Sequence, residues 1–210
     1  QNIVIGGIAG STPPVIGWIV ASAASIPGNL NPLDLGSPVP WMLFILIFLW
    51  TPPHFWALAL YRSGEYAKVG VPMMPDVKGP KRTLLESKIY CLLLLLLGTV
   101  PLFWPDSGLP DAWAVLATGI TIWYSISVWR IDPEEELDSD GRMPLAFASF
   151  MRSLGYLAWM FIAFVFIVAV PNKQVWYWAG GFVLLIPIVN RLLIVWKNSV
   201  NDKTKVLNAE

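Results

Sequence analysis

The chain has 210 residues, of which 56% are apolar and only 13% are charged, and its 14 basic and 14 acidic side chains cancel to a net charge of zero. A soluble domain carries about a quarter charged residues, so this composition excludes an ordinary water-soluble domain and predicts a chain dissolved in a lipid bilayer. The zero net charge and the lack of a basic, aromatic-interleaved patch argue against nucleic acid as a partner, and the single cysteine, Cys91, excludes an internal disulfide.

Apolar segments long enough to cross a membrane recur along the chain. A spanning helix needs about 20 mostly apolar residues, and we expect about six spans, at roughly 3–25, 41–60, 88–105, 112–130, 146–170 and 175–196. The linkers are too short to hold a soluble domain. The sequence therefore predicts an all-α, polytopic transmembrane helical bundle, with one membrane domain over 1–197 and a polar cytoplasmic tail over 198–210.

The first span combines glycines with a proline pair. Gly6 and Gly10 form a G-x-x-x-G pattern, which allows helix backbones to approach closely, and Pro13-Pro14 removes two backbone donors and bends or breaks the helix. We expect a kinked helix that lies either in the bundle interior or along the wall of a substrate cavity.

The second span ends in the run TPPH. Thr51 can cap a helix that restarts at Pro52, because proline suits the first helical position. His54 would then lie in the first turn of the restarted helix, slightly inside the membrane interface. Two interpretations of this histidine stay open: a hydrogen-bonded packing residue, or an iron ligand or proton-transfer group.

A dense, mixed-charge segment follows the second span. Arg62, Glu65 and Lys68 are three residues apart, so on a helix they share a polar face, and Tyr61 stands four residues before Glu65 on the same side. Further on, prolines are expected to hold an extended segment that presents Asp76 and Lys78. Polar groups crowded at a membrane edge are usually functional.

A carboxylate among several cations at a membrane edge suits a substrate with an anionic head and an apolar tail. Mg²⁺ binds through one or two carboxylates together with phosphate oxygens, and Arg and Lys supply further phosphate contacts. A prenyl diphosphate has these two ends. Its allylic cation would be sheltered by aromatic faces, for which Phe55, Trp56 and Tyr61 are candidates. A loop that merely follows the positive-inside pattern would look similar.

The loop over 131–143 is strongly acidic. Glu134 and Asp138 stand four residues apart, which would allow metal chelation on a helix, but Asp-Pro and Ser-Asp-Gly are turn signals. We therefore expect a solvated run of charge.

Basic residues mark one side of the membrane. Thirteen of the 14 Lys and Arg residues fall within 62–88, 130–152 and 191–205, and six alternating spans place these segments on one face. The positive-inside rule assigns that face to the cytoplasm.

The run WTPPHFWALALYRSGEYAKVGVPMMPDVKG at 50–79, together with QNIVIGGIAGSTPPVIGW at 1–18, resembles the UbiA family of intramembrane prenyltransferases. The resemblance is specific over about residues 1–80 and weaker to about 170. It implies a bundle of about nine spans whose two aspartate-rich loops bind Mg²⁺ and farnesyl diphosphate. The T-P-P-H-F and G-V-P-M-M-P runs look like those of members that join farnesyl to a vinyl group of haem b, giving haem o and diphosphate.

The resemblance also implies partners and a location. Besides farnesyl diphosphate, haem b and the lipid bilayer, it implies haem A synthase or the assembly of a terminal oxidase, because haem o serves such oxidases directly or as haem a. The expected location is the inner membrane of a bacterium rather than of a mitochondrion, since no transit peptide is visible.

Site residues carry over by position. Glu65, followed by Tyr66, stands where the family has the aspartate of a D-Y pair, which makes it the implied catalytic carboxylate and metal ligand; glutamate keeps the charge but is one methylene longer. Arg62 and Lys68 are implied to contact diphosphate. The implied substrate-binding residues are His54, Tyr61, Tyr66, Asp76 and Lys78, with Lys78 on diphosphate or a haem propionate, His54 near haem, and Asp76 where relatives are often apolar or amide.

Two departures from the family pattern stand out. The first motif, N-D-x-x-D-x-x-x-D, is absent, and Asn29, Asn31 and Asp34 lie on the wrong face to replace it. The resemblance places that motif upstream of Gln1 with about four further spans, so we expect a C-terminal fragment that is inactive alone. The span at 175–196 extends beyond the usual family end.

Three alternatives remain. A UbiA-type enzyme with a quinone-like acceptor is the nearest. A small transporter would need polar residues at mid-membrane depth, which the third to sixth spans almost lack. A non-catalytic subunit for oxidase assembly would tolerate replacement of Glu65.

Overall fold

The computed structural model describes residues 2–25, 35–62, 65–68, 70–139 and 141–169. Within these ranges every regular element is helical, which confirms the all-α prediction. In chain order the elements are α1 (Asn2–Ser11), α2 (Pro13–Ser25), α3 (Val39–Tyr61), α4 (Glu65–Lys68), α5 (Met74–Phe103), the 3-10 helix η1 (Pro105–Ser107), α6 (Asp111–Trp129) and α7 (Pro144–Ala169).

Five described segments are long and apolar enough to cross a membrane. They are Asn2–Ser22 (across α1 and α2), Val39–Tyr61, Met74–Phe103, Asp111–Trp129 and Pro144–Ile167. These segments match the first five predicted spans and confirm a polytopic helical bundle, because helices satisfy their backbone hydrogen bonds internally, as hydrocarbon requires. The predicted sixth span, 175–196, and the tail, 198–210, lie outside the described residues.

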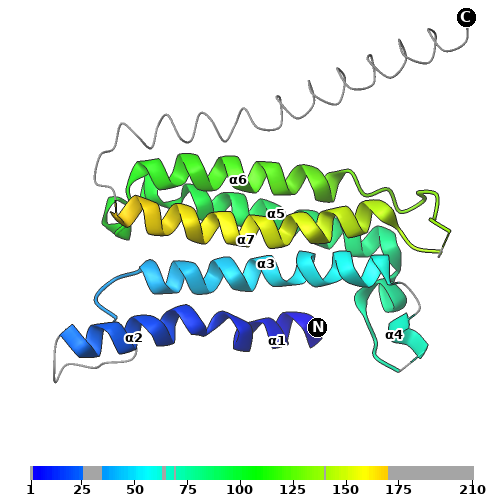
Figure 1. Cartoon of the computed structure of the whole chain (residues 1–210), viewed down its shortest axis with the longest axis horizontal. Coiled ribbons are helices and arrows are strands. Elements are labelled where there is room, and N and C mark those ends of the chain that lie inside the picture. The colour runs from blue at the N-terminus through cyan, green and yellow to red at the C-terminus, as the bar shows by residue number, and fades with distance from the viewer. Residues whose placement is uncertain (1, 26–34, 63–64, 69, 140, 170–210) are drawn as a thin grey trace, which may run out of the picture.

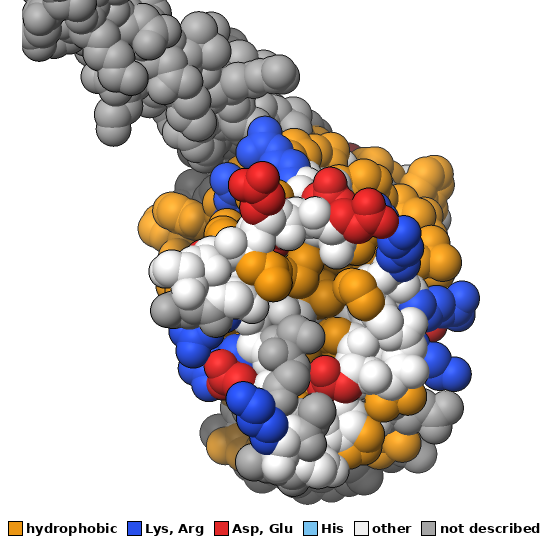
Figure 2. All heavy atoms as spheres, turned by 90° about the vertical axis from the view of Figure 1, so that its right-hand side faces the viewer, with side chains coloured by type: hydrophobic (Ala, Val, Ile, Leu, Met, Phe, Trp, Pro, Cys, Tyr) orange, Lys and Arg blue, Asp and Glu red, His pale blue; other side chains and the backbone are white. Residues whose placement is uncertain are grey.

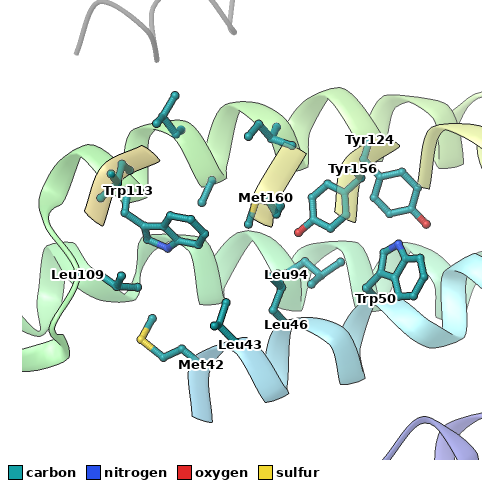
Figure 3. Packing of buried hydrophobic residues seen from close by; sticks show 14 of the residues in the cluster. Met42, Leu43, Leu46, Trp50, Leu94, Leu109, Trp113, Tyr124, Tyr156 and Met160 are labelled. Carbon is teal, nitrogen blue, oxygen red and sulfur yellow. The ribbon is translucent and has the colours of Figure 1, made fainter. Parts of the chain in front are cut away.

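Four helices form the centre of the bundle. In Figure 1, α3, α5, α6 and α7 run side by side; α3 packs on α5 and α7, and α6 packs on the same two helices. Their shared core holds Trp50, Leu94, Tyr124, Tyr156 and Met160 (Figure 3). Cys91 is also fully buried there.

The first span is interrupted at its prolines, in line with the prediction that they bend or break the helix. α1 ends at Ser11 and α2 begins at Pro13, and both pack against α3. The close approach involves a different glycine from those of the G-x-x-x-G pattern. A Cβ atom on Gly7 would lie 3.3 Å from Cγ2 of Thr51, whereas one on Gly6 or Gly10 would meet nothing within 4 Å.

The prediction that a helix restarts at Pro52 is wrong. α3 continues from Val39 to Tyr61 through both Pro52 and Pro53, which are fully buried. Thr51 caps nothing; its Oγ1 donates to the Ile47 carbonyl at 2.8 Å. Membrane helices tolerate internal proline where neighbouring helices and Thr hydroxyls compensate the lost backbone bonds. Packing of α3 on α1, α5 and α7 therefore overrides the local signal.

The extended segment predicted to present Asp76 and Lys78 is shorter than expected. Among the described residues between α4 and α5, 70–73 are non-helical. α5 begins at Met74 rather than near residue 88, so both charged residues lie on its first turns. Pro75 explains this start, because its fixed φ suits the first helical turn. Gly79, with φ of 78° and ψ of 163°, then kinks α5 before its apolar part.

α5 approaches α6 closely at Gly98. A Cβ atom there would lie 3.3 Å from Cβ of Ala117 and 3.6 Å from its backbone carbonyl carbon. We expect Gly98→Leu to destabilise the protein by about 1–3 kcal/mol, the usual cost of overpacking. Thermal unfolding in detergent measures the change. Gly17→Leu is the matched control, since a side chain on the exposed Gly17 meets nothing within 4 Å. Equal effects of the two substitutions would contradict this packing.

Candidate active site

Charged side chains gather at one end of the bundle. Figure 2 shows this end face on, with basic and acidic side chains around an apolar centre. The end of α3, α4, the start of α5, the loop over 130–143 and the start of α7 meet here. Charged side chains gather at an edge of the apolar layer because ionised groups are costly inside hydrocarbon.

Glu65 lies between two arginines. Its Oε1 is 3.1 Å from Nη2 of Arg142, and its Oε2 is 3.5 Å from Nη1 of Arg62. Nη1 of Arg142 also donates to the Tyr61 hydroxyl at 3.3 Å, and its guanidinium lies over the Tyr61 ring at 5.3 Å from the centroid. The structure thus brings together the predicted Tyr61, Arg62 and Glu65.

Arg142 is the member of this cluster that the sequence did not indicate. It is 77 residues from Glu65 in the chain, and no spacing rule links the two loops. The contacts with Tyr61, and then the charge of Glu65, raise the pKa of its guanidinium above the ordinary value, so it stays charged at physiological pH. The only available hint was a lone arginine at the end of an acidic loop.

The cluster is open to ligands. The side chains of Arg62, Glu65 and Arg142 are 51%, 41% and 37% exposed. Ion pairs at this exposure contribute about 1 kcal/mol or less to stability, because solvent screens them. A site of this kind exchanges an ion pair for contacts with an anionic ligand at little cost in stability.

The other charged and aromatic residues predicted for this end lie on α4 and at the start of α5. Lys68 and Tyr66 lie on the single turn of α4, with Lys68 exposed and Tyr66 half-buried. Asp76 and Lys78 are exposed on α5, a different helix from that of Glu65.

The acidic loop behaves as a solvated charge run, as predicted from its turn signals. Residues 131–139 and 141–143 contain no helix, and Glu134 pairs with Lys81 at 2.7 Å with both side chains about three-quarters exposed. Glu135 is the exception: burial raises the pKa of its carboxyl, while the backbone N–H groups of Leu145 and Ala146 at the start of α7 oppose that rise.

One carboxylate alone does not make a metal site. Over the part of the chain that the structure describes, no group of three or more His, Cys, Asp or Glu side chains is placed to hold a metal ion. Glu65 nevertheless fits the way Mg²⁺ binds with diphosphate, which needs only one or two carboxylates besides phosphate oxygens and water.

His54 is packed on both faces. Its ring stacks between Trp50, at 4.3 Å between centroids, and Phe150, at 4.7 Å, and is only 6% exposed. Nδ1 is 2.5 Å from Oγ of Ser153, whose own proton goes to the Phe150 carbonyl, so Nδ1 carries the hydrogen. These contacts support the interpretation of His54 as a hydrogen-bonded packing residue that joins α3 to α7; a contact with haem stays a prediction.

An apolar groove lies between α1 and α3. Its volume is about 400 Å³, within the range of small-molecule pockets, and it is lined by Asn2, Ile3, Gly6, Gly7, Gly10, Ile47, Trp50, Thr51 and Phe55. Gly6 and Gly10 leave room because they carry no side chain. This favours the cavity-wall interpretation of the first span over the interior one.

Comparison with known proteins assigns the family. Residues 1–154 match the UbiA prenyltransferase family. A protoheme IX farnesyltransferase of Parvibaculum lavamentivorans is 47% identical over 135 residues, covering 63% of this chain and 39% of that protein. The enzyme of the same name from Sinorhizobium fredii is 41% identical over 184 residues, covering 87% and 52%.

A third protoheme IX farnesyltransferase, from Vesicomyosocius okutanii, is 38% identical over 167 residues, covering 79% of this chain and 50% of that protein. The chain thus spans about half or less of the length of these curated relatives. No solved structure matches it. With a family match over most of its length and several apolar spans, this multi-pass membrane chain belongs to the UbiA prenyltransferase family.

Proposed function

We propose that the protein containing this chain transfers farnesyl from farnesyl diphosphate to a vinyl group of haem b, giving haem o and diphosphate. The name shared by the relatives supports this pair of substrates. The observation that carries the proposal is the position of the cationic cluster and the apolar groove along one helix, α3.

The two features have the spacing that a prenyl diphosphate needs. Phe55 lines the groove, and Arg62 follows it by seven residues. At a rise of 1.5 Å per residue these positions are about 10 Å apart along the helix axis. A diphosphate at Arg62 can therefore extend its first isoprene unit toward the groove, with the tail in hydrocarbon and the charge at the membrane edge.

The basic residues bind the anionic head. Arg62 and Lys68 contact the diphosphate, and Lys78 contacts either the diphosphate or a haem propionate. Glu65 would hold Mg²⁺ together with phosphate oxygens, and such an ion would neutralise charge that develops on the leaving diphosphate. Fixed cations at the developing charge favour the transition state over the ground state.

Aromatic faces stabilise the positive charge on the farnesyl carbon as its C–O bond breaks. Among the three candidates, Phe55 is 38% exposed and lines the groove, so it is best placed. Trp56 is 3% exposed and packs its ring on Tyr90, which removes it from this role. Tyr61 already carries Arg142 on its ring and serves the head-group end instead.

A quinone-like acceptor is the alternative within the family, and assays with each acceptor separate the two.

We further propose that the charged end faces the cytoplasm of a bacterium, following the positive-inside rule. The product would pass to haem A synthase or to terminal-oxidase assembly.

Replacing Glu65 tests the carboxylate. In the protein expressed from its complete gene, Glu65→Gln should lower farnesyl transfer about 100-fold or more, because it removes the negative charge while keeping the shape. Turnover of haem b to its farnesylated product, measured by mass spectrometry, gives the result. Glu134→Gln is the control, since it removes a carboxylate paired with Lys81 at the same end. Unchanged turnover in Glu65→Gln would remove Glu65 from the site.

Replacing the cations tests the head-group contacts. Arg62→Ala and Lys68→Ala should each raise the half-saturating concentration of farnesyl diphosphate about tenfold and leave that of haem b nearly unchanged, because each removes a charge-assisted contact to phosphate. Steady-state kinetics with each substrate varied in turn measures both values. An equal rise for both substrates would point to a folding defect instead.

Cysteine labelling tests the orientation. Cys91 is fully buried, so thiols introduced by Glu136→Cys at the charged end and Asp106→Cys at the opposite end can be labelled selectively in this chain. A membrane-impermeant reagent added to intact cells should label position 106 and spare position 136. The reverse pattern would contradict the cytoplasmic assignment.

A further inference from the structure

Arg142 joins two parts of the site that are distant in the sequence. It contacts Glu65, in α4, and Tyr61, the last residue of α3, while its own backbone lies two residues before α7. We propose that Arg142 is a positioning residue of the diphosphate site, fixing the Glu65 carboxylate relative to the bundle. This role rests on the proposed function for its substrate, a prenyl diphosphate with Mg²⁺.

The backbone of Arg142 is held in place from both sides. Its N–H donates to Oδ1 of Asp138 at 2.9 Å, and its carbonyl accepts from the Asp138 N–H at the same distance. Gly141, with φ of 74°, allows the turn that precedes it. A backbone held in this way fixes the point from which the Arg142 side chain extends, which is what a supporting residue requires.

A small apolar cluster anchors the same region to the bundle. It contains Leu60, Leu84, Ile131, Met143 and Ala146, with Tyr61 packed against it. Met143 follows Arg142 directly. The centroid of the Tyr61 ring lies 4.7 Å from the centroid of the Phe147 ring on α7. The position of Arg142 is therefore set by α3, α5 and α7 rather than by its loop alone.

Arg62 cannot supply this function. It caps α3 and is only three residues from Glu65, so their ion pair stays within the segment that continues α3 and does not join that segment to α7. Arg142 does so, because it comes from the loop before α7 and the neighbouring Met143 packs against α3, α5 and α7. The two arginines also exceed the single carboxylate by one positive charge, which leaves an anionic ligand a favourable place to bind.

Binding of inorganic diphosphate with Mg²⁺ to the protein from its complete gene, measured by titration calorimetry, tests the role. Arg142→Ala should weaken this binding about three- to fivefold, the effect expected for one exposed ion pair. Arg130→Ala removes the same charge from the same end and should leave the affinity unchanged. Wild-type affinity in Arg142→Ala would overturn the inference.

A double-mutant cycle with Glu65→Gln tests whether Arg142 acts through that carboxylate. Arg142→Ala should weaken diphosphate binding much less in the Glu65→Gln background than it does alone. If the fold-changes of the two single substitutions simply multiply in the double variant, the residues act independently and the positioning role is refuted. Arg142→Lys keeps the charge but not the two-point contact, so it should recover less than half of the lost affinity. Full recovery would show that charge alone matters. The Arg142→Lys variant also decides the case if Arg142→Ala fails to fold.

Turnover of farnesyl diphosphate and haem b by the wild-type protein separates this inference from the proposed function. A wild type that binds diphosphate with the expected Arg142–Glu65 coupling but does not farnesylate haem refutes the function and upholds the positioning role. An active wild type with no coupling refutes the positioning role alone.

Discussion

The cost of placing charge in hydrocarbon organises this protein. Five described segments cross the apolar layer as helices. Charged side chains gather at one end of the bundle, where α3 ends, α4 lies and the loop before α7 returns. Because several chain segments must end at that face, residues that are far apart in the sequence meet there. The Glu65–Arg142 pair is the clearest result of this constraint.

The hydropathy pattern of the sequence therefore predicts most of the fold. The first five spans and the interruption at Pro13 follow from local composition, since backbone groups in lipid must find their hydrogen-bond partners within helices. Local signals failed where packing decides. Pro52 predicts a helix start, yet the surrounding helices keep α3 continuous. Pro75 is predicted to lie in an extended segment, yet it lies in the first turn of α5.

Only part of the candidate site could be predicted from the sequence. Tyr61, Arg62 and Glu65 are neighbours in one segment, so helical spacing predicts their proximity. Arg142 escaped, because hydropathy says which loops share a face but not which side chains touch across it. His54 shows the converse: a suggestive motif residue turns out to stack between Trp50 and Phe150, where it joins two helices.

The central claim is that a diphosphate at the Glu65 cluster extends its isoprenoid tail into the groove between α1 and α3. Photolabelling with a farnesyl diphosphate analogue, reactive at the far end of its tail, tests it most directly. Peptide mapping should find the label on groove residues such as Gly6, Ile47 or Phe55, and excess farnesyl diphosphate should suppress it. Label confined to the outward faces of the helices, or insensitive to that competitor, would contradict the claim.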